Sequence, residues 1–368
     1  VVAPVLATPL LWGGAWASEL LLWLTRFFAD LPLSTVELPD FGATASLLYA
    51  AGLACWAVGE RRWRLGGLLV PAALGLVLLL PHLTPEPALR ITFLSVGQGD
   101  SVVLSSRGHH ALVDGGGVPG GADPARRVIL PFLRASRIER LDLAVLSHPH
   151  PDHALGLIST LKEVRTDRLW LAAESTEGFL SRQLVAAATG ARVEEVQLGH
   201  PSFLLGEATL EVLGPPEDRV LMEGVNDKSV VLLVRHGDVT VLLTGDVEEE
   251  GAAALLESGR LGPVSVVKAP HHGSRTSSTE AFLERLRPRY VVFCVGRRNR
   301  FGFPHPEVEA RYRARGTECL RTDVHGAITL ESDGRDVRLS AFLPPEAKAS
   351  PAPIAPVASR PHRPGDDS

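Results

Sequence analysis

The residues with the clearest capacity for chemistry lie in one short segment, residues 147–153, which reads SHPHPDH. In an extended loop the side chains of His148 and His150, two positions apart, leave the backbone on the same side. Pro149 and Pro151 restrict the backbone and stiffen the loop. Imidazoles and a carboxylate without a thiolate suit Zn, Mn, Fe or Ni. The segment therefore predicts a divalent-metal site; the alternative is a polar surface loop with incidental histidines.

The neighbouring elements are expected to place this segment at the edge of a sheet. It follows the apolar run 141–147 and precedes a predicted helix at 154–164, so it lies at the carboxyl end of a strand, where open α/β sheets bind ligands. Apolar runs alternating with amphipathic stretches predict an α/β fold with sheets covered on both faces. The other predicted strands are 91–96, 230–235 and 239–245, and the other predicted helices are 124–135, 247–258, 279–286 and 306–315.

Residues 1–87 have a different composition and are expected to form transmembrane helices. Three runs with at most one charged residue, 2–24, 41–59 and 65–83, each approach the about 20 residues that cross a bilayer as a helix. Each run taken alone could instead be a helix of a soluble core. The arginines of the loop 60–64 favour the cytoplasmic side. This predicts a multi-pass protein of the cell (inner) membrane with an extracytoplasmic C-terminal domain.

The rest of the chain is expected to form one domain and a tail. The proline-broken stretch 82–87 is typical of a linker, residues 88–343 are predicted to form the hydrolase domain, and the Pro/Ala/Ser-rich residues 344–368 are predicted to be disordered. Because the chain opens with Val in apolar sequence, we interpret it as the C-terminal part of a longer protein. The net charge of −5 argues neither for a strongly basic nucleic-acid module nor for an acidic tail, and three cysteines exclude a disulfide framework.

The segment HPHPDH resembles the HxHxDH signature of the metallo-β-lactamase superfamily, and three other segments follow in that family's order. DGG at 114–116 resembles its early Asp-Gly element, TGD at 244–246 its late Gly-Asp motif, and PHHGS at 270–274 its last histidine motif. The resemblance implies an αββα sandwich, here preceded by membrane-spanning helices. It also implies a hydrolase that uses one or two divalent ions, Zn or Mn.

A narrower resemblance concerns the ComEC family of competence DNA-uptake channels. It rests on VGQGD at 96–100, NDKS at 226–229, KAPHHGS at 268–274 and NRFGFPHPEV at 299–308. In that family a multi-spanning channel is followed by an extracytoplasmic β-lactamase-like domain. The resemblance implies a nuclease or phosphodiesterase that hydrolyses DNA outside the membrane. Its partners would be single-stranded DNA, the lipid bilayer and other DNA-uptake components. The alternatives are a domain that only binds or guides DNA, and a phosphodiesterase acting on a surface polymer or small ester.

The superfamily pattern also implies a set of metal ligands. His148 and His150 would hold one metal, Asp152 and His153 the other, Asp246 would bridge them, and His272 would complete the Asp152/His153 site. His271 would face the substrate phosphate, although the reverse assignment of the tandem histidines is the alternative. Asp152 and His271 are thus the catalytic candidates.

One histidine of the pattern is missing. After the run 208–213 the chain reads Gly214-Pro215-Pro216, where many members have a ligand for the first metal. His200 lies before that run and is a poor substitute. The His148/His150 metal would therefore be completed by Asp246 and water, or be weakly occupied.

Four further residues are candidates for positioning the ligands or contacting substrate. The resemblance implies that Asp114 supports the metal loop from behind. Asp100 is a turn carboxylate or orients a ligand histidine. Asn226 forms a hydrogen bond near the site or caps a turn. His305 approaches the phosphate or is a plain surface histidine.

Arginines crowd the region just beyond the last histidine motif. Only Glu307 and Glu309 oppose them there. This density suits a polyanion backbone, with solvated helix faces as the alternative. Interleaved aromatic residues could stack on the bases of single-stranded DNA or belong to the core. The arginines are Arg285, Arg287, Arg289, Arg297, Arg298, Arg300, Arg311, Arg313 and Arg315, and the aromatic residues are Tyr290, Phe293, Phe301, Phe303 and Tyr312.

Overall fold

The computed structural model describes residues 3–29, 43–58, 67, 69, 72–73, 87–172, 178–218, 222 and 224–343. The chain divides into two units, Val1–Pro85 and Glu86–Ser368.

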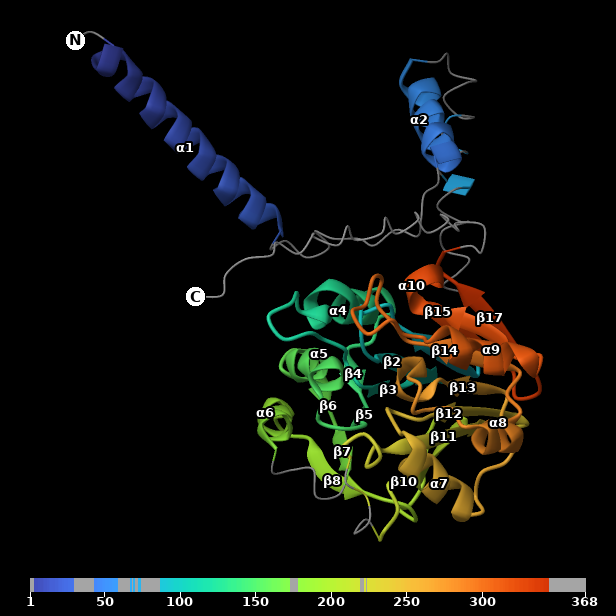
Figure 1. Cartoon of the computed structure of the whole chain (residues 1–368). Coiled ribbons are helices and arrows are strands. Elements are labelled where there is room, and N and C mark those ends of the chain that lie inside the picture. The colour runs from blue at the N-terminus through green and yellow to red at the C-terminus, as the bar shows by residue number, and fades with distance from the viewer. Residues whose placement is uncertain are drawn as a thin grey trace, which may run out of the picture. The chain divides into compact units, whose positions relative to one another are not determined.

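The first unit contains the helices α1 (Ala3–Ala29) and α2 (Ala43–Val58), shown in Figure 1. The predicted spans 2–24 and 41–59 fall largely on these helices. Within the described ranges, however, no helix has both the length and the apolar character needed to cross a bilayer. The loop 60–64, the predicted tail 344–368 and most of the third predicted span, 65–83, lie outside the described residues.

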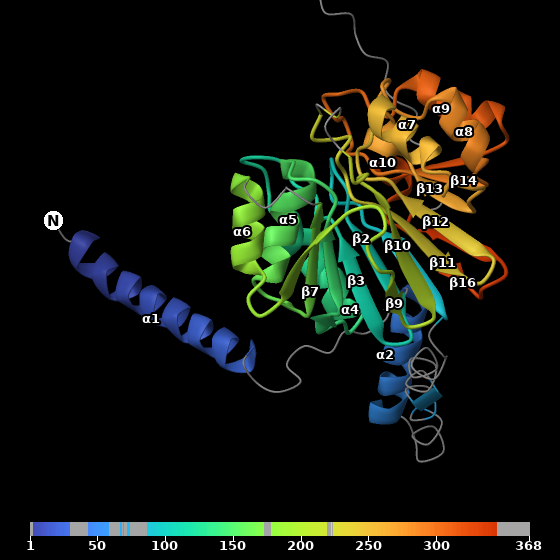
Figure 2. The same cartoon turned by 90° about the horizontal axis from the view of Figure 1, so that it is seen from below.

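The described residues of the second unit form two large sheets that pack face to face (Figure 2) and a small third sheet of two strands. One large sheet contains, in spatial order, β17 (Val337–Ala341), β16 (Ile328–Ser332), β1 (Leu89–Phe93), β2 (Val102–Ser106), β3 (His109–Val113), β5 (Leu143–Leu146), β7 (Arg168–Ala172) and β8 (Arg192–Val196). The other contains β15 (Glu318–Arg321), β14 (Tyr290–Phe293), β13 (Val266–Lys268), β12 (Val239–Leu243), β11 (Val231–His236), β10 (Ala208–Gly214) and β9 (Phe203–Leu205). The small sheet pairs β4 (Arg140–Leu141) with β6 (Arg165–Thr166).

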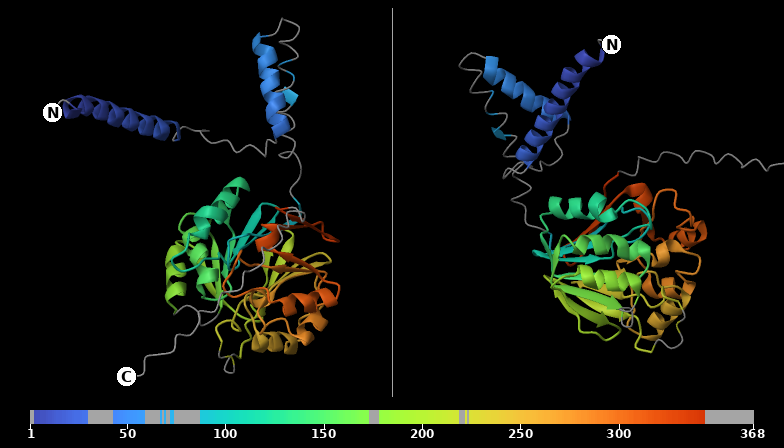
Figure 3. Two further views of the ribbon diagram at one scale, coloured as in Figure 1. Left: turned by 45° about the horizontal axis from the view of Figure 1, so that its top comes forward. Right: turned by 90° about the vertical axis from the view of Figure 1, so that its left-hand side faces the viewer.

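Helices cover the outer face of each large sheet (Figure 3). Because successive strand residues point to opposite faces, Val102 and Leu104 pack between the sheets, whereas Val103 packs toward the helices. This explains the continuous apolar strands and confirms the predicted αββα sandwich. The first sheet is covered by the π-helical turn at Ala125–Ile129, α4 (Leu130–Ala135), α5 (Pro151–Leu161) and α6 (Phe179–Ala187). The second is covered by α7 (Glu249–Glu257), α8 (Glu280–Leu286) and α9 (Pro306–Ala314).

One boundary differs from the prediction in a way that affects the site. We expected the helix after the histidine segment at 154–164, but α5 begins at Pro151, with His150 as its N-cap. Proline suits the first turn because its missing N–H would have no partner there. Asp152 and His153 therefore belong to the first helical turn and not to the preceding loop. The helix α6 and the short helix α10 (Thr322–His325) were not predicted.

Candidate metal centre

The loops that carry the predicted residues meet at the carboxyl ends of parallel strands. β3 runs parallel to β5 in the first sheet, and β12 runs parallel to β13 in the second. Asp114 follows β3, and the histidine segment that begins at His148 follows β5. Asp246 and His272 follow β12 and β13. The sandwich therefore brings polar side chains from both sheets to one place.

Four of the predicted ligands form one close group: Asp152, His153, Asp246 and His272 offer ligand atoms that all lie within 4.8 Å of one another. The Oδ2 atom of Asp246 lies 3.2 Å from the Nε2 atom of His153 and 3.2 Å from the Nε2 atom of His272. Asp152 Oδ2 lies 3.5 Å from His272 Nε2. Imidazole nitrogens and carboxylate oxygens at this spacing can hold a divalent cation.

The fit to a cation is tested by polar atoms that the protein leaves without partners. The Nε2 atoms of His148, His153 and His272 are buried and have no hydrogen-bond partner among the residues that the structure describes. All three lie within 4.0 Å of Asp246 Oδ2. Leaving a buried polar atom unpaired costs free energy, so three such atoms around one carboxylate indicate a bound ion. The donor set fits the predicted divalent metal.

The electrostatics of the group also favour positive charge. Burial alone would lower the pKa of His272, but the carboxylates of Asp246 and Asp100 raise it to about 10. Burial would likewise lower the pKa of His153, yet Asp246 and Asp114 raise it. Burial lowers the pKa of His148, which keeps that imidazole neutral, as metal ligation requires.

His148 and His150 lie beside this group without forming a second complete one. Their ring centroids are 4.7 Å apart, and His148 Nε2 lies 4.0 Å from Asp246 Oδ2. In the described part of the chain, no set of three closely spaced ligand atoms includes either histidine. His200 contacts Trp170, with ring centroids 5.1 Å apart, and does not join them. The histidine missing from the sequence is not replaced in space by His200.

Asp114 contacts the metal segment from its inner side. Its Oδ1 accepts a hydrogen bond from the backbone N–H of Ser147 (2.7 Å), and its Oδ2 accepts one from the Ser147 hydroxyl (2.7 Å). Asp114 Oδ2 also lies 2.8 Å from His153 Nδ1. This contact fixes the ring so that Nε2 faces Asp246, as carboxylates behind ligand histidines do. Burial raises the pKa of Asp114.

Lys268 is a central residue that the sequence analysis did not single out. It is fully buried, and its Nζ lies 2.5 Å from Asp100 Oδ2 and 3.1 Å from Asp246 Oδ1. It also donates a hydrogen bond to the Gly245 carbonyl (2.7 Å). Burial would lower the pKa of Lys268, but the two carboxylates raise it. The available signal was a lysine that ends the otherwise apolar strand β13.

Asp100 has two contacts on the far side of the group. Besides Lys268, its Oδ1 lies 3.3 Å from His272 Nδ1. Of the two roles considered for Asp100, this geometry fits the orientation of a ligand histidine. Its backbone N–H also donates a hydrogen bond to the Asp152 carbonyl (3.2 Å), which ties the loop 97–100 to the first turn of α5.

His271 lies at the rim, and a carboxylate missed by the sequence analysis accompanies it. Its Nδ1 lies 2.7 Å from Glu248 Oε1, and its Nε2 lies 3.9 Å from Asp246 Oδ2. Asn226 donates a hydrogen bond to the same Glu248 oxygen (2.8 Å). Asn226 thus positions Glu248, which in turn positions His271. Burial lowers the pKa of His271.

His305 is separated from the metal group by an aromatic ring. It is the N-cap of α9, and its backbone N–H donates a hydrogen bond to the Gly273 carbonyl (3.0 Å). Its ring contacts Phe303 (centroids 5.4 Å apart), and Phe303 contacts His271 (5.5 Å). Phe303, one of the aromatic residues considered for base stacking, therefore lies next to the site.

Two of the five interleaved aromatic residues, Phe293 and Tyr312, are fully buried in the core. Most of the arginines of the predicted basic region have structural partners. Six arginines contact backbone carbonyls or carboxylates: Arg285, Arg287, Arg289, Arg311, Arg313 and Arg315. Arg297, Arg298 and Arg300 are exposed, and none of them has a carboxylate partner among the described residues. Of the nine arginines, these three have neither a carboxylate nor a backbone carbonyl partner in the described part of the chain, and all three lie on the loop after β14.

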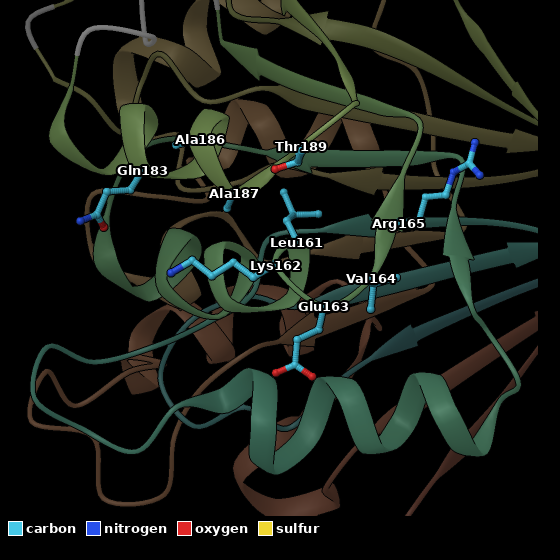
Figure 4. A pocket seen from close by; sticks show the side chains of 9 residues that line it. All are labelled: Leu161, Lys162, Glu163, Val164, Arg165, Gln183, Ala186, Ala187 and Thr189. Atoms are coloured by element: carbon cyan, nitrogen blue, oxygen red, sulfur yellow. The ribbon is translucent and has the colours of Figure 1, made fainter. Parts of the chain in front are cut away.

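A separate cavity of about 470 Å³ lies at the other end of α5 (Figure 4). It is lined by Lys162 in the turn after this helix, by Arg165 of β6 and by residues of α6 such as Gln183. None of its lining residues belongs to the metal group. The candidate chemistry therefore lies at the N-terminal end of α5 and not in this cavity.

Known proteins resemble the chain in sequence and in fold. The family model described as "Metallo-beta-lactamase superfamily" matches residues 94–297. "ComE operon protein 3" of Bacillus subtilis (strain 168) is 26% identical over 357 residues, 90% of this chain and 45% of that protein. "Competence protein ComA" of Neisseria gonorrhoeae is 32% identical over 334 residues, 87% of this chain and 43% of that protein.

Among solved structures, the metallo-beta-lactamase fold protein YhfI from Bacillus subtilis has a TM-score of 0.45 and 12% identity, covering 69% of this chain and 100% of that one. The competence relatives confirm the narrower resemblance found in the sequence. This chain spans less than half the length of these curated relatives.

Proposed function

We propose that this chain, which belongs to the metallo-beta-lactamase superfamily, is the phosphodiesterase part of a competence-type DNA-uptake protein. It would hydrolyse DNA with one or two divalent ions, Zn or Mn. The observation that carries the proposal is the convergence of three unpartnered, buried imidazole nitrogens on Asp246 Oδ2.

The residues around the ion would have distinct tasks. Asp152, His153, Asp246 and His272 would hold one ion, with Asp246 shared toward a weaker site at His148 and His150. A divalent ion supplies Lewis-acid polarisation of a phosphoryl oxygen and lowers the pKa of water toward about 7. The buried side chains supply a fixed, water-excluded environment in which such charge effects are strong.

Two residues, Asp152 of the metal group and His271 at its rim, would face the substrate, because both are partly accessible. The side chain of Asp152 is 26% exposed and that of His271 is 21% exposed, while His153, Asp246 and His272 are buried. The Glu248 carboxylate lies 2.7 Å from His271 Nδ1, and His271 Nε2 is the nitrogen nearer Asp246. Nε2 would accept a proton from water or, once protonated, donate a hydrogen bond to a phosphate oxygen.

DNA as substrate is supported by the resemblance to the competence DNA-uptake family, by the printed name of one relative, "Competence protein ComA", and by the local charge. Arg297, Arg298 and Arg300 are exposed beside the site, although the whole chain carries a net charge of −5. Such a local basic segment suits a phosphate backbone. We propose single-stranded DNA as substrate and cleavage outside the membrane. The same proposal includes a domain division at about residue 88, a multi-pass membrane location, and contacts with the bilayer and other uptake components.

The test combines metal analysis with cleavage assays on the purified chain. We expect about one tightly bound Zn or Mn ion per chain, and hydrolysis of single-stranded DNA that stops on chelation. Asp246→Asn and the double variant His150→Ala/Asp152→Ala should lose both activity and the tight ion. His200→Ala, a histidine outside the group, should retain both. Full cleavage by the double variant would refute the proposed centre.

The incomplete ligand set at His148 and His150 favours one alternative, a domain that only guides DNA. Less than one ion per chain, with salt-sensitive DNA binding and no turnover, would support it.

A second alternative is a phosphodiesterase that acts on a surface polymer or small ester. Comparing the turnover of single-stranded DNA, duplex DNA and a small chromogenic diester separates this enzyme from a nuclease.

A further inference from the structure

The loop of residues 296–303, called the arginine loop here, is held in a defined shape by one side chain. The Asn299 amide donates hydrogen bonds to the carbonyls of Gly296 (3.2 Å) and Phe303 (2.8 Å). Its Oδ1 accepts a hydrogen bond from the backbone N–H of Phe303 (2.9 Å). Because one residue bridges both ends, the loop does not need to become ordered when a ligand binds.

This loop presents two stacked aromatic rings that lead from solvent to the metal centre. The centroids of Phe301 and Phe303 are 5.4 Å apart, and the rings are 17° from parallel. Phe303 contacts His271 at the rim of the centre (5.5 Å), whereas Phe301 is 47% exposed. An exposed phenyl ring that continues a stack has one face available for another flat group.

The same loop carries unpaired positive charge. Arg297, Arg298 and Arg300 are exposed and have no carboxylate partner within the described ranges. The Arg300 guanidinium lies 4.9 Å from the centroid of the Phe301 ring. Elsewhere in the basic region, arginines such as Arg289 and Arg313 pair with carboxylates. Arg300 therefore places positive charge against the exposed ring, and Arg297 and Arg298 lie on the same loop.

We propose that the arginine loop binds unpaired nucleotides of a single strand: a base stacks on Phe301 while Arg297 and Arg300 contact the adjacent phosphates. A flat group flanked by anions is the chemistry that an exposed ring with neighbouring guanidinium groups recognises. Bases in an intact duplex are already stacked on one another, so the loop favours single strands over duplex. The inference rests on the proposed function, since it places the bound strand next to the hydrolytic centre.

The test is equilibrium binding without metal, so that it does not depend on catalysis. Fluorescence anisotropy of the full chain with a labelled single-stranded oligonucleotide gives the Kd in low salt with chelator present. Phe301→Ala should raise the Kd about tenfold, as expected for one lost base stack, and Phe301→Trp should restore it. Phe179→Ala, an exposed phenylalanine on α6, is the matched control and should have no effect.

An abasic strand of the same length separates the two contacts. Phe301→Ala should not weaken binding to it, because it has no base to stack. Arg297→Gln/Arg300→Gln should weaken binding to both strands and reduce the salt dependence.

Two results would overturn the inference: no binding of single strands by the wild-type chain, or equal effects of Phe301→Ala on normal and abasic strands. Intact, Phe301-dependent binding with no metal-dependent cleavage would instead refute the proposed function and leave this inference standing.

Discussion

At the scale of single residues, Asp246 divides its two carboxylate oxygens between different partners. Oδ1 lies 3.1 Å from the Lys268 ammonium, whereas Oδ2 lies 3.2 Å from the imidazoles of His153 and His272. The lysine therefore sets the orientation of the carboxylate and leaves Oδ2 as the oxygen presented to an ion. A strongly hydrated ammonium is buried only when carboxylates compensate it, and Asp100 and Asp246 do so here.

Lys268→Met keeps the apolar stem of this side chain and removes its charge. The change leaves two buried carboxylates without their cation, so we expect a loss of about 3–5 kcal/mol in the free energy of unfolding. Urea denaturation of the metal-free chain measures this quantity. Lys162→Met, an exposed lysine, should change it by less than about 0.5 kcal/mol. Similar values for the two variants would contradict the compensating role of Lys268.

Asp114→Asn tests the support of the metal segment with little disturbance of the backbone. Asp114 has a φ of 60°, a region that asparagine tolerates well. The amide cannot accept hydrogen bonds at both of its polar atoms, so the contacts with Ser147 and His153 are not all retained. We expect metal affinity to fall about 10–100-fold, measured by competition with a chromogenic chelator. Unchanged affinity would show that Asp114 does not orient His153.

At the scale of elements, the N-terminus of α5 is positioned by glycines of neighbouring loops. A Cβ atom on Gly99 would lie 1.9 Å from the Asp152 carbonyl oxygen, and one on Gly115 would lie 2.0 Å from the Leu157 backbone nitrogen. The helix therefore approaches these loops more closely than any side chain would allow. This close packing places Asp152 and His153 opposite the second sheet.

Gly99→Ala and Gly97→Ala separate this close packing from backbone strain. Both glycines have positive φ, 112° and 89°, but a Cβ on Gly97 would meet open space. Gly97→Ala should therefore cost only the left-handed penalty of about 1–2 kcal/mol. Gly99→Ala should destabilise the chain further and weaken metal binding, because the first turn of α5 must move. Thermal unfolding and metal titration measure both effects, and equal metal affinity in the two variants would contradict this packing argument.

At the scale of the whole molecule, the metal group joins the two sheets. Asp152 and His153 follow a strand of the first sheet, whereas Asp246 and His272 follow strands of the second. An ion held by all four would bond the two halves of the sandwich together at one edge. Metal binding should therefore stabilise the fold as well as enable chemistry.

Addition of Zn or Mn to the chelator-treated chain should raise its Tm. An ion at about 100 times its Kd stabilises the fold by about 2.7 kcal/mol, which corresponds to roughly 5–10 °C for a domain of this size. The shift should disappear in Asp246→Asn and persist in His200→Ala. A bound ion that leaves the Tm unchanged would contradict the proposed link between the sheets.

How far the site could be predicted differs from residue to residue. His148 and His153 share one segment, so their proximity follows from local geometry, and a resemblance to known motifs added Asp246 and His272. Glu248 and Lys268 were missed because each looks ordinary in its own stretch: an acidic residue just before a helix, and a lysine at the end of a strand. Their partners are distant in sequence, and only folding brings them together.

The amino-acid sequence by itself determined an α/β fold with covered sheets and a metal type of chemistry, because hydrophobic periodicity and closely spaced ligands are local properties of the chain; the resemblance to the superfamily added the αββα sandwich. Only the tertiary structure decided which arginines remain unpaired, where α5 begins, and how Asp246 divides its oxygens. These features depend on side chains that are up to 168 residues apart, as Asp100 and Lys268 are. Their energies come from burial and charge pairing, which exist only after the two sheets have packed.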